Sequence, residues 1–221
     1  PAEVADFEER GWLIRHGIQY HWLNQGFGSF EEFLASLSSR KRKAMRKERA
    51  AARQGLEFRV LRGAEIRPEH WDAMWAFYQD TGARKWGRPC LTRAFFDQVA
   101  ASMGPSILLF LALRDGRPIA GALNWVGADT LYGRYWGCTE EVPFLHFELC
   151  YYQAIEWACE HGLAAVHAGA QGEHKLARGY QPVLTHSAHH LPNRSFREAV
   201  ARFLVAEREA IAAELEAMRA E

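Results

Sequence analysis

Residues 107–126 read ILLFLALRDGRPIAGALNWV, and this stretch decides the fold that the sequence predicts. Two apolar runs, 107–113 and 118–126, flank Asp115-Gly116, a dipeptide typical of the tight turn in a β-hairpin. A third run over 130–136 follows the turn residues 127–129. The sequence therefore predicts three successive strands joined by short turns.

The pattern changes to helical spacing further along the chain. A helix is expected over 145–161, with these apolar residues on one face: Phe147, Cys150, Tyr151, Ala154 and Ala158. Short strands are expected over 164–167 and 182–190, with a polar corner between them.

A last helix is expected to open with a capping box formed by Ser195 and Glu198. The side chains that it is expected to bury are Phe196, Val200, Phe203, Leu204, Ile211, Leu215 and Met218. Three strands followed by alternating helices and strands predict an α/β fold.

The segment before the hairpin divides into an arm and a helical pair. A capping box at Ser29 and Glu32 opens a helix that is expected to break at Ser38-Ser39 and to end at Gly55. Next come a strand over 56–61, a helix from Pro68, a polar loop over 81–90 and a helix over 92–102. Residues 7–12 end an earlier helix, and a strand is expected over 19–23.

Composition limits the class of protein more than it identifies a partner. Lysine plus arginine equals aspartate plus glutamate at 27 each, so the net charge of the whole chain favours no ligand. The four cysteines show no CxxC spacing, which favours buried thiols in a reducing compartment. No run of eighteen apolar residues or signal peptide is present, so we expect a cytoplasmic chain without a membrane span.

Residues 169–180, GAQGEHKLARGY, place a carboxylate, an imidazole, an ammonium and a guanidinium within six positions. Such a strand-to-helix corner is where an α/β enzyme places reactive side chains and free backbone N–H groups. His174 is a candidate proton acceptor because its free pKa lies near ~6.5. The alternative is a solvated loop with a short helix.

Three phrases resemble one bacterial family: SSRKRKAMRKER (38–49), ARKWGRP (83–89) and GAQGEHKLARG (169–179). The family is associated with peptidoglycan biosynthesis or recognition and is related to the Fem-type aminoacyl transferases. The resemblance implies a GNAT-like acyltransferase fold, with a mixed, largely antiparallel sheet flanked by helices. It also implies two such lobes in tandem: residues 1–28 would close an upstream lobe, 29–55 form a basic helical arm, and 56–221 form this lobe.

On this resemblance we expect transfer of an acyl or aminoacyl group to a small-molecule or peptide amine, with a cell-wall precursor as one candidate. The expected catalytic residues are Glu173, His174 and Lys175. The expected substrate contacts are Lys85, Trp86, Arg134, Tyr135, Gln171 and Arg178. Trp71 and Trp75 lie one helical turn apart, and for them core packing is the favoured interpretation.

The basic arm is the expected contact for a polyanion. Between residues 38 and 54 its basic residues are Arg40, Lys41, Arg42, Lys43, Arg46, Lys47, Arg49 and Arg53, against one acid, Glu48. Such a stripe suits phosphates, including those of tRNA, and Arg42, Lys43, Arg46 and Lys47 are its predicted contacts. The alternative is a solvated helix whose charge is balanced by acids elsewhere.

The acyl donor stays open between acetyl-CoA and aminoacyl-tRNA. RYWGCT (134–139) partly matches the pyrophosphate cradle of acetyl-CoA enzymes, but Glu140, Glu141 and Pro143 separate it from the next helix. Two rival interpretations remain: an acetyl-CoA-dependent N-acetyltransferase, and a non-catalytic lobe that recognises RNA or an anionic polymer. His186, His189 and His190 crowd one strand without a completing carboxylate pair, so no metal site is expected.

Overall fold

The computed structural model describes residues 2–85 and 89–219. The chain folds into two compact units. The terminal unit comprises Pro1–His21, Gly169–Leu176 and Tyr180–Glu221, and the central unit comprises Trp22–Ala168 and Ala177–Gly179.

The central unit contains five neighbouring strands in the order β2-β3-β4-β5-β6. Their bounds are β2 (Glu57–Arg62), β3 (Ile107–Arg114), β4 (Arg117–Val126), β5 (Thr130–Cys138) and β6 (Ala165–His167). All neighbours are antiparallel except β5 and β6, which are parallel. Asp115 and Gly116 have φ values of 50° and 75°, as the tight hairpin turn between β3 and β4 requires. The predicted hairpin and third strand are confirmed.

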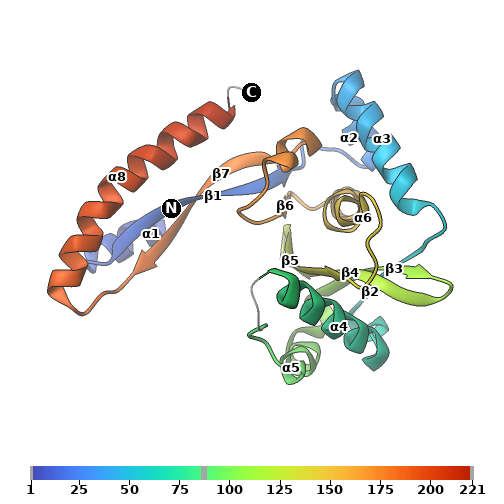
Figure 1. Cartoon of the computed structure of the whole chain (residues 1–221). Helices are drawn as coiled ribbons and strands as arrows, with labels where there is room; N and C mark the ends of the chain where they lie inside the picture. The colour runs from blue at the N-terminus through green and yellow to red at the C-terminus, as the bar shows by residue number, and fades with distance from the viewer. Residues whose placement is uncertain (1, 86–88, 220–221) are drawn as a thin grey trace. The chain divides into compact units, whose positions relative to one another are not determined.

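Helices cover both faces of this sheet (Figure 1). One face carries α4 (Pro68–Lys85) and α5 (Arg93–Met103). The other carries one helical segment built from α6 (Leu145–Phe147), a π-helical turn η3 (Glu148–Tyr152) and α7 (Gln153–Glu160). A single 3-10 turn, η1 (Gly63–Glu65), precedes α4, and another, η2 (Gly104–Ser106), follows α5. The α/β class and the largely antiparallel sheet between helices are therefore confirmed.

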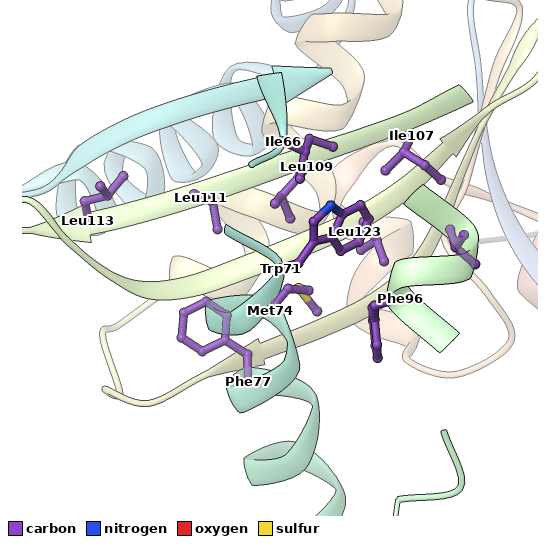
Figure 2. Close-up of a cluster of buried hydrophobic side chains, with 11 residues drawn as sticks. Ile66, Trp71, Met74, Phe77, Phe96, Ile107, Leu109, Leu111, Leu113 and Leu123 are labelled. Carbon is purple, nitrogen blue, oxygen red and sulfur yellow. The ribbon is translucent and has the colours of Figure 1, made fainter. Parts of the chain in front are cut away.

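The core under α4 and α5 is made by alternate residues of β3 (Figure 2). Ile107, Leu109 and Leu111 are fully buried there against Trp71 and Phe96. Burial of side chains of this size contributes roughly 1.5–3 kcal/mol each. Trp71 is thus a core residue, as its spacing predicted.

The arm consists of α2 (Phe30–Ser36) and α3 (Ser39–Arg53), so the predicted break is confirmed. Ser29 accepts the Glu32 N–H through its hydroxyl, and Ser38 accepts the Lys41 N–H in the same way. Met45 and Ala52 are the buried residues of α3.

The terminal unit contains α1 (Ala2–Glu9), most of β1 (Leu13–Leu23), β7 (Gln181–His189) and α8 (Arg194–Arg219). The 3-10 segment η4 (Glu173–Arg178) begins in this unit and ends in the central one. Strands β1 and β7 pair antiparallel from Leu13↔His189 to His21↔Gln181. Arg15 of β1 holds α8 through an ion pair of 2.7 Å with Glu207.

The predicted start of the last helix is wrong, whereas its predicted apolar face is right except at two residues. Asn193, not Ser195, caps α8, because its Oδ1 accepts the N–H of Phe196. Of the residues that α8 was expected to bury, Leu204 and Leu215 are buried, whereas Phe196 and Phe203 are 59% and 62% exposed.

Two further expectations need correction. The polar loop expected from 81 begins later, because α4 continues through Gly82 to Lys85. Cys90 is exposed rather than buried, while Cys138 and Cys159 are buried. The proposed division into 1–28, 29–55 and 56–221, with an upstream lobe, stays a prediction.

The close approach of α4 to β5 predicts the effect of one substitution. A Cβ on Gly137 would collide with the backbone carbonyl of Phe77, which cannot move without moving α4. We expect Gly137→Ala to lower the free energy of unfolding by about 1–3 kcal/mol, measured by urea denaturation. Gly104→Ala is the matched control, since its Cβ would meet no atom within 4 Å. Equal stability of the two variants would contradict this packing role.

Candidate functional site

The candidate site begins where β5 and β6 stop pairing. The two strands are parallel from Thr130↔Ala165 to Tyr132↔His167. On the other side of β5 the pairing with β4 slips, because Leu123 faces Tyr135 while Asn124 faces Gly133. Arg134 is therefore the extra residue of a β-bulge, a feature that often re-aims a side chain beside a functional site.

A cavity of about 150 Å³ lies beside this bulge. Its lining residues come from β4, β5, the residue after β6, and the helix over the sheet: Ala122, Leu123, Asn124, Gly133, Arg134, Tyr135, Trp136, His146, Cys150, Tyr151 and Ala168. Arg134 is the one permanent charge among these residues. Its guanidinium carbon lies 5.1 Å from the centroid of the Tyr135 ring, which holds the cation against an aromatic face.

Asn124 is the buried polar residue of the lining, with 2% of its surface exposed. Its Nδ2 donates to the carbonyl oxygens of Leu108 and Ala122 at 3.4 and 3.1 Å. Its Oδ1 would lie 3.5 Å from a Cβ on Gly133, so this acceptor points toward the bulge. The cavity thus combines a cationic donor with a neutral acceptor.

A second cavity, of about 530 Å³, shares Trp136 and His146 with the first. The other residues around it are Arg84, Cys138, Glu140, Glu141, Val142, Pro143, Phe144, Leu145 and Phe147. The His146 ring lies 5.2 Å from the ring of Trp136 and 5.2 Å from that of Tyr151. His146 therefore belongs to the wall between the two cavities.

The ion pairs near the second cavity tie its charged residues to neighbours. Arg114 donates to Glu140 at 2.9 Å, and Arg84 lies 3.4 Å from Glu141. Arg84 also pairs with Asp80 and donates to the Cys138 carbonyl at 3.1 Å. The positive charge of Arg84 is thus shared between two carboxylates.

The opposite side of the same helical segment is fixed by a buried ion-pair network. Glu148 is fully buried and accepts hydrogen bonds from Arg49 at 2.9 Å and Arg53 at 2.8 Å. Arg49 also pairs with Glu156 at 2.7 Å. Because Glu148 stands in the π-helical turn, the network fixes that turn against α3.

Arg178, a predicted substrate contact, lies in a second buried pair. It donates to both carboxylate oxygens of Glu48 at 2.8 Å and to the Tyr152 hydroxyl at 3.0 Å. Its guanidinium carbon also lies 3.5 Å from the centroid of the Phe147 ring. These contacts give Arg178 a structural role within the central unit.

Burial also sets the state of the neighbouring phenols. Burial raises the pKa of Tyr151 and of Tyr152 well above the usual value, and the hydrogen bond to Glu48 raises the pKa of Tyr152 further. Both hydroxyls therefore stay protonated at neutral pH.

Four of the other predicted residues belong to the corner. Gln171, Glu173, His174 and Lys175 are part of the terminal unit. Lys175 is buried, with its Nζ 3.3 Å from the Gly169 carbonyl and 5.3 Å from the Tyr20 ring centroid, whereas His174 and Gln171 are exposed. Lys85 is the last residue of α4, and Trp86 lies outside the described residues.

The predicted contacts on the arm divide into paired and exposed cations. Arg46 pairs with Glu31 at 2.5 Å, and Arg42 donates to the Ala35 carbonyl at 3.2 Å. Lys43 and Lys47 are exposed on α3. Arg49 and Arg53 serve the buried network, so part of the stripe balances acids elsewhere in the fold.

Asn124, His146 and the site role of Cys150 and Tyr151 were not predicted from the sequence. Asn124 interrupts an apolar strand, which is a readable signal for a buried polar site. Cys150 and Tyr151 were assigned to the core face of a regular helix. The π-helical turn changes which residues share a face, and the sequence gives no signal for it.

The whole chain, residues 1–221, matches a FemAB-like family described as acting in peptidoglycan biosynthesis or recognition. The chain belongs to this family. No curated protein sequence matches it significantly.

Three solved structures share the fold. L-PGS from Bacillus licheniformis has a TM-score of 0.61 at 15% identity, with 92% of this chain and 68% of that chain covered. The structure described as FemX has a TM-score of 0.60 at 14% identity, with 90% and 70% covered. The C-terminal domain of a lysylphosphatidylglycerol synthetase from Agrobacterium fabrum has a TM-score of 0.55 at 14% identity, with 77% and 51% covered. The FemAB-like chain thus spans about half of that last structure.

The predicted family is confirmed by the match over the whole chain, and the predicted mixed, largely antiparallel sheet between helices belongs to a fold shared with the FemX structure. In the part of the chain that the structure describes, none of the helices has the length and hydropathy needed to span a bilayer.

The buried network gives a stability prediction. Glu148→Gln keeps the shape of the side chain but leaves Arg49 buried without its full counter-charge, so we expect a loss of about 3–5 kcal/mol in unfolding free energy. Glu31→Gln removes the exposed pair with Arg46 and should cost less than about 1 kcal/mol. Urea denaturation of both variants measures the difference, and equal costs would show that Glu148 is not a structural anchor.

Proposed function

We propose that this chain transfers an aminoacyl group to an amine. Two findings support a transferase role: membership of the FemAB-like family and a fold shared with FemX. The observation that carries the proposal is the cavity at the point where β5 and β6 part, with Arg134 on its bulge and Asn124 in its wall.

Acyl transfer needs a donor for the oxygen that becomes negative in the transition state. The Arg134 guanidinium is the cationic donor beside the small cavity, and the bulge sets its direction. The volume of about 150 Å³ suits the reacting end of a substrate rather than a whole cofactor. We therefore assign the cavity to the acyl group, with Arg134 next to its carbonyl oxygen.

Asn124 favours an aminoacyl group over an acetyl group. Both of its amide hydrogens are directed to backbone carbonyls, and its Oδ1 is an acceptor directed toward the bulge. An α-ammonium group can donate to this oxygen, whereas an acetyl group has no N–H to offer.

The region that would have to hold a coenzyme A pyrophosphate supports the same choice. Gly137 serves the packing of α4, and in the loop after it Glu140 and Glu141 already pair with Arg114 and Arg84, the cations that a phosphate would need there. The N–H of Leu145, at the start of the helix, already donates to the Val142 carbonyl. An aminoacyl-tRNA donor fits better, and the exposed Lys43 and Lys47 on α3 would meet its phosphates.

The family description supports a cell-wall precursor with a free amine as the acceptor. A second candidate for the catalytic groups is the corner, with Glu173, His174 and Lys175. The corresponding candidates for substrate contacts are Gln171, Lys85 and Trp86.

Activity should depend strongly on Arg134. In transfer of labelled amino acids from mixed aminoacyl-tRNA to amine-bearing peptidoglycan precursors, we expect Arg134→Gln to lower kcat/KM by about 10²–10³-fold. The control is Arg117→Gln, an exposed arginine at the start of β4.

Three outcomes would count against the proposal. Transfer from acetyl-CoA instead of aminoacyl-tRNA would make the chain an acetyltransferase. Unchanged turnover in Arg134→Gln together with loss of turnover in His174→Ala would move the chemistry to the corner. Binding of RNA without turnover of either donor would leave a recognition lobe.

A further inference from the structure

We propose that the terminal unit binds a phosphate group between the β1–β7 ribbon and α8, held by the guanidinium of Arg208 and the imidazoles of His16 and His186. These three residues belong to the terminal unit, whereas Arg134 and Asn124 belong to the central unit. The phosphate site is therefore distinct from the cavity proposed for acyl transfer.

Two contacts align α8 with β1 inside the terminal unit (Figure 1). Glu207 pairs with Arg15 at 2.7 Å, and the Tyr20 hydroxyl donates to the sulfur of Met218 at 3.6 Å. Between these contacts α8 advances by eleven residues and β1 by five, which is about 16 Å for either element. The helix and the strand thus run side by side, so the residues that follow Arg15 and Glu207 lie near each other.

Arg208 stands on the buried face of α8. It follows Leu204 by four residues and precedes Leu215 by seven, and these two leucines are the buried residues of the helix. The Nε atom of Arg208 is buried and has neither a hydrogen-bond acceptor nor an ion-pair partner among the residues that the structure describes. Buried charges in proteins are normally paired, so this guanidinium requires an anionic acceptor.

Two imidazoles lie on the ribbon face that α8 covers. His16 and His186 are directly opposite each other in the β1–β7 pairing, and their ring centroids are 4.9 Å apart at an interplanar angle of 85°. By strand alternation His16 shares its face of β1 with Tyr20, which contacts α8. His186 is exposed and His16 is partly buried, so a ligand from solvent can reach both rings.

The charges around His16 favour an anion. Burial lowers the pKa of the His16 imidazole, the positive charges of His186 and Arg208 lower this pKa further, and Glu8 of α1 acts in the opposite direction. Glu207 is already neutralised by Arg15. A bound anion would reverse the effect of the two cations and raise the pKa of His16.

Phosphate suits these donors better than a carboxylate or chloride. A guanidinium binds phosphate through a fork of N–H groups, and each protonated imidazole offers further N–H donors. Phosphate has enough acceptor oxygens for all three side chains, and it carries up to about two negative charges near neutral pH. A carboxylate has two oxygens and one charge, and chloride has no directional acceptor. An inorganic phosphate ion and a phosphate monoester share this chemistry.

The binding test uses inorganic phosphate as the probe, with acetate and chloride at equal ionic strength as comparisons. NMR of the histidine ring protons follows each titration, and His16→Gln and His186→Gln assign the signals. We expect saturable shifts of both rings, phosphate binding about ten-fold or more tighter than acetate, and a higher pKa of His16 in the complex. Binding should also tighten from pH 8 to pH 6, because the imidazoles gain protons.

Matched variants separate the site from the general charge of the unit. We expect Arg208→Gln to weaken phosphate binding about ten-fold or more, whereas Arg202→Gln, an exposed arginine of the same helix, leaves it unchanged. His186→Gln should weaken binding about five-fold, and His189→Gln, on the opposite face of β7, should not. Glycerol 3-phosphate in place of the free ion shows whether the site takes a monoester.

Thermal unfolding of the unaltered chain gives a second measurement. Because the pKa of His16 is lowered in the folded chain, the unfolded chain binds more protons below about pH 6.5, and stability should fall with pH there. Phosphate should raise the Tm relative to acetate at equal ionic strength, and more at pH 6 than at pH 8.

Three results would overturn the site. The first is phosphate binding no tighter than acetate binding, with equal Tm values in the two anions at pH 6. The second is unchanged phosphate binding by a folded Arg208→Gln variant. If Arg208→Gln does not fold, equal phosphate affinity of His186→Gln and His189→Gln is the third.

Discussion

The buried carboxylate of Glu148 is the constraint on which the rest of the site depends. It has no exposed surface and is neutralised by Arg49 and Arg53, so the helical segment after β5 must keep one face against α3. Glu148 lies in a π-helical turn, and the neighbouring His146, Cys150 and Tyr151 line the cavities beside β5. One helical segment thus serves as both structural anchor and cavity wall.

The same constraint explains why the arm is basic although only some of its cations are exposed to a ligand. Arg49 and Arg53 neutralise Glu148 and Glu156, and the single acid of α3, Glu48, pairs with Arg178. The remaining cations lie on the exposed side of α3, so one helix can have an inner face that fixes the fold and an outer face suited to phosphates. Removing charge from the two faces should therefore have different consequences.

Much of the fold could be predicted because it follows local rules. The hairpin at Asp115-Gly116 and the capped break at Ser38 depend on neighbouring residues. The site was harder, because it depends on irregularities of the backbone. The bulge at Arg134 and the π-helical turn at Glu148 arise from tertiary pairing, and no residue spacing in the sequence predicts either of them. The exposed Phe196 and Phe203 show the same limit, since periodicity predicts an apolar face but not what covers it.

Acyl transfer at the point where β5 and β6 part can be tested by residue-resolved hydrogen exchange of the chain, alone and with a stable amide-linked analogue of aminoacyl-tRNA. We expect added protection at residues 133–136 and 145–151, beyond any protection of the arm that uncharged tRNA also produces. Protection confined to the arm, identical for charged and uncharged tRNA, would contradict it.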